Sequence, residues 1–188
     1  MVREIVLYGD EVLRERCQPV AQITDEIHAL AADLIETMVE AEGVGLAAPQ
    51  VGIAKQLAVI DVTGAKEPLT FFRVDGKEEA WEKWMPLKFV NPSLTFPDKG
   101  KCSMNEGCLS FPDVRAEIRR PDIVKATLTL LDGRQVVIET DGLLSRAIQH
   151  ETDHLFGLLF IDRASPAVKL TLKKKIQKMW AEYADGPE

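Results

Sequence analysis

The sequence has no long uninterrupted run of apolar residues, although 46% of its 188 residues are hydrophobic. A membrane-spanning helix needs about 20 consecutive apolar residues, so this absence argues against a membrane protein. The amino terminus also lacks the charged segment and apolar stretch that together mark a secretory leader. These two absences predict a soluble protein of the cytoplasm.

Cysteine is scarce, and basic residues are outnumbered. An odd count of three cysteines, with no secretory leader, predicts free thiols in a reducing compartment rather than a disulfide framework. The formal net charge is −7, which argues against DNA binding and general nucleic-acid binding. One region differs, because the stretch from 163 to 181 has no acidic residue. It carries Lys169, Lys173, Lys174, Lys175 and Lys178. Such a run is most often only a solvated helix face.

The chain is long enough to bury a core, and no repeat, low-complexity tract or linker divides it. We therefore expect one domain over residues 1–188. Apolar residues recur at helical spacing from about Thr24 to Glu42, which predicts an amphipathic helix that ends at Gly43.

Strand signals in the rest of the chain favour antiparallel pairing. Residues 56–62 are typical of a strand, and a later strand contains Pro92, which would confine it to a sheet edge or a strand start. Segments 123–131 and 134–140 flank Asp132-Gly133, the strongest short hairpin signal. The sequence thus favours hairpins over strand–helix–strand units.

The string HETDH places two imidazoles one helical turn apart, with a carboxylic acid between them. On a helix, His150 and His154 can hold one metal ion, and Glu151 can take a proton from water bound to that ion. A metallohydrolase is therefore the first interpretation. The alternative is a pair of core histidines satisfied by ordinary hydrogen bonds.

The residues around this string support a helix over 142–155, which contains no proline. Asp141 can accept hydrogen bonds from backbone N–H groups at the helix start, and Gly157 can end the helix in a left-handed cap.

A catalytic divalent metal usually has three protein ligands and one open position. In the zinc-protease pattern HExxHxxGxxH the third ligand would be at position 160, which is Phe160. The remaining histidine, His28, lies far upstream and is typical of a surface residue. The carboxylates of Asp162 and Glu182 stay open as ligands of a protease-like site. Cys108 is another candidate, because a preceding glycine permits a backbone that aims the thiolate at a site.

A third segment, GVGLAAPQ at residues 43–50, follows the first predicted helix. It lacks the lysine of a phosphate-binding loop and the strand-first order of a dinucleotide fingerprint, so nucleotide binding is not expected. Its glycines can let the backbone line a cleft, where Gln50 would offer an amide to a substrate oxygen. The alternative is a small-residue loop where chain segments pack closely.

The segments GVGLAAPQ, EGCLS and QHETDH resemble the signature motifs of the peptide deformylases, and the match runs from Gly43 to Gly157. The resemblance implies a single α+β domain, in which antiparallel β-sheets pack around a central metal-binding helix flanked by amino-terminal and carboxy-terminal helices. It also implies a metal-dependent hydrolase that removes the formyl group from the amino-terminal formylmethionine of newly made polypeptides and releases formate.

The resemblance further implies roles for individual residues. The implied metal ligands are Cys108, His150 and His154. A metal-bound water would attack the formyl carbon, with Glu151 as general base and then general acid. The metal, the Leu109 N–H and the Gln50 amide would stabilise the formyl oxygen. The residues implied in substrate binding are Val44, Gly45, Arg115, Leu143 and Ala147. Asp153 would pair with Arg120 as structural support, since a buried unpaired carboxylate is costly.

One divalent metal ion is implied, and the resemblance favours Fe²⁺ in the cell, with Zn²⁺ or Ni²⁺ in purified protein. Formyl-Met nascent peptides would be the substrates, and the lysine-rich last helix would dock on ribosomal RNA. A zincin-like peptidase and a non-catalytic metal-stabilised binding module are the alternatives. Departures from the family pattern are Glu11, Asp113 and the long stretch from Gly64 to Pro86, which bear on substrate preference and surface contacts.

Overall fold

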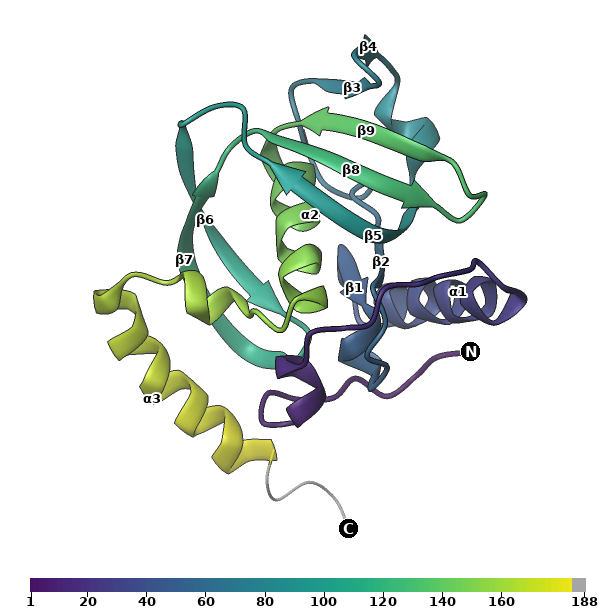
Figure 1. Cartoon of the computed structure of the whole chain (residues 1–188). Coiled ribbons are helices and arrows are strands. Elements are labelled where there is room, and N and C mark those ends of the chain that lie inside the picture. Colours follow the sequence, from purple (N-terminus) through teal and green to yellow (C-terminus); the bar gives the residue numbers. More distant parts are fainter. Residues whose placement is uncertain (184–188) are drawn as a thin grey trace.

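The computed structural model describes residues 1–183, and the last residues of the expected domain, 184–188, lie outside the described part. Its helices are α1 (Asp25–Glu40), α2 (Gly142–Leu155) and α3 (Pro166–Tyr183). Short 3₁₀ helices precede or connect these elements (Figure 1). Helix α1 lies within the range predicted from its hydrophobic spacing, and no helix in residues 1–183 has the length and apolar character to span a membrane.

The strands form two sheets. The larger has the order β1-β2-β5-β8-β9-β3-β4. Its strands are β1 (Gly45–Ala47), β2 (Leu57–Ile60), β3 (Phe72–Val74), β4 (Lys77–Glu78), β5 (Leu87–Thr95), β8 (Val124–Leu130) and β9 (Gln135–Thr140). The smaller sheet pairs β6 (Lys101–Cys108) with β7 (Phe111–Pro121). Neighbouring strands in both sheets are antiparallel, so the predicted α+β fold is confirmed.

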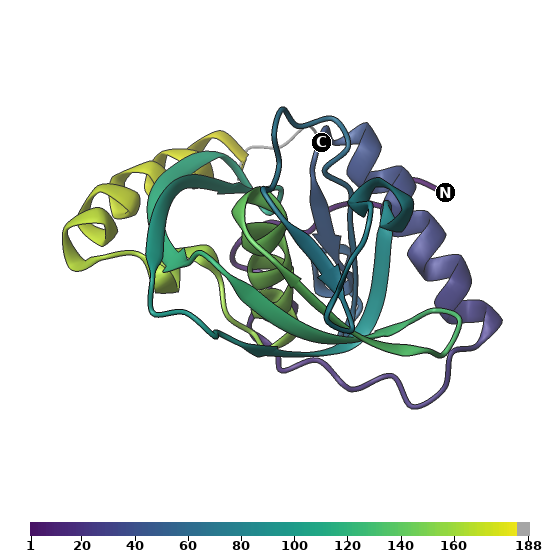
Figure 2. The same cartoon turned by 90° about the horizontal axis from the view of Figure 1, so that it is seen from above.

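Helix α2 occupies the centre of the molecule, between the two sheets (Figures 1 and 2). The pair β6–β7 and helix α3 lie on one side of it, and β1, β2 and α1 lie on the other. Every residue from 144 to 155 is buried. The polar side chains of α2 therefore lie away from bulk water and need partners inside the protein.

The carboxyl end of α2 forms as predicted. Gly157 has φ of 72°, the left-handed conformation that glycine adopts without strain. Its N–H donates to the His154 carbonyl, and the Leu158 N–H donates to the Asp153 carbonyl. These bonds satisfy carbonyls that the helix end would otherwise leave without partners.

Asp141 is the N-cap residue of α2, but the prediction that its side chain accepts hydrogen bonds from the helix start is wrong. Its carboxylate accepts hydrogen bonds from the backbone N–H of Thr70 at 2.7 Å and from the Thr70 hydroxyl. The N–H groups of Leu143 and Leu144 donate instead to the carbonyl of Pro68. The segment from Gly64 to Pro86 thus supplies the cap of the central helix, because Asp141 holds it in place.

Pro92 lies inside β5, which is between β2 and β8 in the sheet order. The pairing with β2 ends at Val90, so at Pro92 itself the strand pairs on the β8 side alone, which agrees with the predicted edge position. The pairing of β5 with β8 shifts register between Val90 and Ser93, which marks a bulge. Asn91 has φ of 51° there, and its side chain exchanges two hydrogen bonds with the backbone of Val20. A bulge tolerates a proline inside a sheet because the ladder is already interrupted.

Candidate active site

Three sulfur and nitrogen donors converge where β6 ends beside α2. The Cys108 Sγ lies 3.3 Å from the His154 Nε2, which lies 3.3 Å from the His150 Nε2. All three donor atoms lie within 4.8 Å of one another. Residues 1–183 contain no other group of three His, Cys, Asp or Glu side chains that is close enough to hold a metal ion. The structure therefore brings together the three predicted metal ligands.

The other candidate ligands do not join this group. Asp162 accepts hydrogen bonds from Arg14 and from the Leu159 N–H. Glu182 pairs with Lys178 one helical turn away. His28 is exposed on α1. The donors are therefore one thiol and two imidazoles, with no carboxylate in the group.

The pKa values of the two imidazoles are shifted in opposite directions. Burial lowers the pKa of His150, but hydrogen bonds with Cys108 and Glu106 outweigh this effect and raise it well above its usual value. Burial and the charge of His150 lower the pKa of His154. Two positively charged rings at this distance would repel one another. One positive charge between the two rings suits this geometry, and a divalent ion bound to both imidazoles would take the place of the His150 proton.

Glu151 points from α2 toward β1. Its Oε2 is buried and has no hydrogen-bond partner in the described chain, and burial raises the pKa of the side chain to about 7. A Cβ atom on Gly45 would lie 2.8 Å from the Glu151 Cδ. Glycine at this position is therefore what leaves room for the carboxyl group beside the cluster.

The amide of Gln50 is held in one orientation. Its Oε1 accepts a hydrogen bond of 2.9 Å from the Ala47 N–H. Its Nε2 consequently faces the cluster, 3.4 Å from the Cys108 Sγ and 3.3 Å from the Ser110 Oγ. The buried donor thus lies next to the point where the three ligand atoms meet.

A cavity of about 520 Å³ opens beside these groups. It is lined by Gln50, Cys108, Leu109, His150, Glu151 and the predicted substrate-binding residues Val44, Gly45, Arg115, Leu143 and Ala147. Val44 and Arg115 are exposed, whereas Ala147 is buried. Asp113, one of the departures from the family pattern, also lines the cavity and has φ of 58°.

A sequence model of polypeptide deformylase matches residues 2–170. A peptide deformylase of Methylacidiphilum infernorum is 43% identical over 179 residues, which cover 95% of this chain and 93% of that protein. The chain belongs to the polypeptide deformylase family. The crystal structure of a peptide deformylase from Legionella pneumophila covers 100% of both chains, with 32% identity and a TM-score of 0.80. The one from Thermotoga maritima covers 88% of this chain and 99% of its own, with 36% identity and a TM-score of 0.75.

Membership of the deformylase family confirms the resemblance carried by the three motifs, and it confirms that the chain is an enzyme. The family implies a single divalent metal ion, and the cluster of one cysteine and two histidines is able to hold one.

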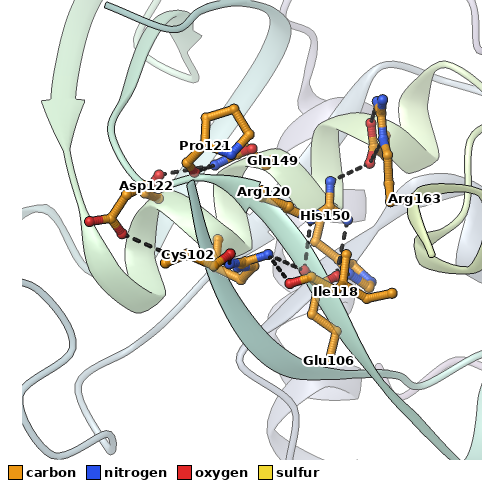
Figure 3. A network of polar contacts seen from close by, with 12 residues as sticks. Cys102, Glu106, Ile118, Arg120, Pro121, Asp122, Gln149, His150 and Arg163 are labelled. Atoms are coloured by element: carbon orange, nitrogen blue, oxygen red, sulfur yellow. Dashed lines mark hydrogen bonds and ion pairs between the residues drawn. The ribbon is translucent and has the colours of Figure 1, made fainter. Parts of the chain in front are cut away.

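Sequence reasoning missed Glu106, which lies at the centre of a buried polar network in this deformylase-family chain (Figure 3). Its carboxylate accepts hydrogen bonds from Arg120, at 2.7 and 3.0 Å, and from Arg146 at 2.8 Å. The same carboxylate contacts the His150 Nδ1 at 3.1 Å. A signal existed, because alternate residues of a strand face the same side, and Glu106 lies two residues before Cys108.

The network continues away from the cluster. Arg120 donates to Asp153 at 2.6 Å, so the expected pair is present, and Arg163 donates to the other oxygen of Asp153 at 2.5 Å. Burial raises the pKa of Glu106, but hydrogen bonds from His150 and Arg120 outweigh this effect and lower it to about 2. The carboxylate is therefore ionised, and it orients His150 so that its Nε2 faces Cys108 and His154.

We expect Glu106→Gln to weaken metal binding by about 10- to 100-fold, because the amide loses the charge that polarises His150. Competition with a chromogenic chelator measures this affinity. Glu117→Gln is the matched control, since Glu117 is exposed on the neighbouring strand. Equal metal affinities of the two variants in this competition would contradict this role of Glu106.

Proposed function

We propose that this chain removes the formyl group from the amino-terminal formylmethionine of newly synthesised polypeptides, and releases formate and a free amine. The convergence of Cys108, His150 and His154 beside the buried Glu151, in a chain of the polypeptide deformylase family, carries this proposal. The reaction is a hydrolysis: the water oxygen bonds to the formyl carbon, and the bond from that carbon to the amine nitrogen breaks.

Cys108, His150 and His154 would hold one divalent ion. Thiolate and imidazole donors bind iron, zinc and nickel, and we propose Fe²⁺ in the cell and Zn²⁺ or Ni²⁺ in purified protein. When bound, the ion supplies Lewis acidity, which lowers the pKa of water and polarises a carbonyl group.

Glu151 acts as the proton carrier. Its carboxylate takes a proton from the attacking water and then delivers it to the departing amine nitrogen. A pKa of about 7, raised by burial, suits a group that must accept and release a proton near neutral pH. Its free Oε2 leaves one oxygen available for this exchange.

Negative charge grows on the formyl oxygen during the attack. The Gln50 amide is the side-chain donor for that oxygen, because its Oε1 is already held by Ala47 and its Nε2 faces the cluster. The Leu109 backbone N–H, at the turn after Cys108, is the second donor. Fixed donors of this kind stabilise developing charge without having to reorient.

The lining of the cavity supports the remaining substrate contacts that we propose. Val44, Leu143 and Ala147 provide apolar surface for the methionine side chain, and Gly45 brings backbone close to the peptide. The exposed Arg115 contacts the peptide beyond the methionine. Two residues support the site from behind the cluster, namely Asp153 and Arg120.

The substrates leave the ribosome, so we propose a cytoplasmic location and docking on ribosomal RNA through α3. The inner face of α3 packs against β7 and buries Leu172 and Met179. The lysines of α3 are exposed, although the Lys175 Nζ also donates a hydrogen bond to the Arg115 carbonyl of β7. The domain as a whole is proposed to extend over residues 1–188.

We expect wild-type protein to release formate from a formyl-Met peptide without cleaving internal peptide bonds. Glu151→Ala should lower kcat by about 100-fold or more, because the proton carrier is lost while the metal ligands remain. Formate release and bound metal are measured on the same samples. Equal rates at equal metal content would exclude a catalytic role for Glu151, and cleavage of unformylated peptides would favour a peptidase.

Gly45→Ala should lower kcat by about 10-fold or more, since the new methyl group would displace the Glu151 carboxyl group that transfers the proton. Bound metal should be unchanged. Gly64→Ala is the matched control, because a Cβ at Gly64 meets no atom within 4 Å. An unchanged kcat for the Gly45 variant would show that Glu151 does not need this space.

Reversing two charges on α3 should release the protein from ribosomes. Lys173→Glu/Lys174→Glu reverses two exposed charges and leaves the buried Leu172 in place, so formate release should persist. Ribosome co-sedimentation at increasing salt measures the binding. The control is Lys55→Glu/Lys77→Glu, which changes two exposed lysines elsewhere. Equal sedimentation of both variants with wild type would overturn docking through α3.

A further inference from the structure

A second cavity, of about 590 Å³, lies on a different face of α2 from the active-site cavity. Its walls come from α2, β5, β6, β7 and the segment after α2. On α2 it is lined by Gln149, Thr152 and Asp153, whereas the active-site cavity is lined by Leu143, Arg146, Ala147, His150 and Glu151. The two cavities have no lining residue in common, so this second cavity, here called the rear groove, is a separate site.

The rear groove is positively charged. Lys101 of β6 and Arg119 of β7 line it with exposed side chains, and neither forms an ion pair with any residue of the described chain. Arg163 adds a third cation, with 45% of its side chain exposed. Asp153 is the one carboxylate among the lining residues, and Arg120 and Arg163 already pair with it. The groove thus has an excess of positive charge that a ligand can neutralise.

The same groove has apolar walls that face water. Phe96 is 46% exposed and Leu158 is 37% exposed, and both line it together with Leu94 and Phe156. Large apolar side chains left in contact with water at a concave surface mark binding sites. Thr152 is only 5% exposed, and its hydroxyl has no hydrogen-bond partner among residues 1–183. The groove wall therefore also contains an unused hydroxyl donor.

We propose that the rear groove binds a small amphipathic anion, namely an organic carboxylate, sulfonate or phosphate ester with an apolar body. The acidic group would lie against Lys101 and Arg119, since guanidinium and ammonium groups form their strongest hydrogen bonds with such oxygens. The apolar body would cover Phe96 and Leu158. This site is separate from formyl-peptide hydrolysis and does not depend on it.

Fluorescence titration with 8-anilinonaphthalene-1-sulfonate tests the proposal, because this probe combines an aromatic body with one sulfonate. The metal-loaded full chain should bind it saturably. Lys101→Glu/Arg119→Glu should weaken binding by about 10-fold or more. The control Lys55→Glu/Lys77→Glu should bind like wild type, and formate release should be unchanged in both variants.

A matched uncharged probe, N-phenyl-1-naphthylamine, separates charge recognition from apolar adsorption. We expect it to bind more weakly than the sulfonate to wild type and equally to wild type and Lys101→Glu/Arg119→Glu. Phe96→Ser should weaken binding of both probes. Wild-type sulfonate affinity in Lys101→Glu/Arg119→Glu, or equal affinity of the two probes for wild type, would overturn the proposal.

Discussion

The carboxylate of Glu106 is the interaction on which the centre of this molecule depends. It is buried and ionised, and such a group is stable inside a protein only when its partners are complete. Arg120 comes from the strand paired with its own, whereas Arg146 and His150 come from α2. The carboxylate therefore joins the two-stranded sheet to the central helix. Because it also fixes the ring of His150, the fold and the donor cluster depend on the same atoms.

A helix whose residues are nearly all buried gives the site its chemical character. Residues 144–155 have little contact with water, so charges there interact strongly and pKa values shift. The helix ends are fixed by other parts of the chain, since Pro68 caps the start and Gly157 terminates the end. Both ends are thus held, which limits how far His150 and His154 can move relative to Cys108.

The sequence predicted those features that depend on short-range spacing. Two histidines one turn apart, the hairpin at Asp132-Gly133 and the left-handed glycine after α2 are all local patterns, and all are present. The prediction that the Asp141 side chain caps α2 failed because partners distant in sequence competed for it. Thr70 and Phe71 take the carboxylate of Asp141, and the contact between Asn91 and Val20 supports a bulge at Pro92. Local preference does not contain this information.

By itself, the sequence determined the α+β class, the family motifs and the residue types able to bind a metal, because each is written in neighbouring residues. Only the tertiary structure decided that Cys108, rather than Asp162 or Glu182, lies beside the two histidines. It alone revealed Glu106 and Arg146 behind the cluster, and the need for glycine at 45. The physical reason is that buried charges and close contacts are satisfied in space, between segments that the order of residues does not connect.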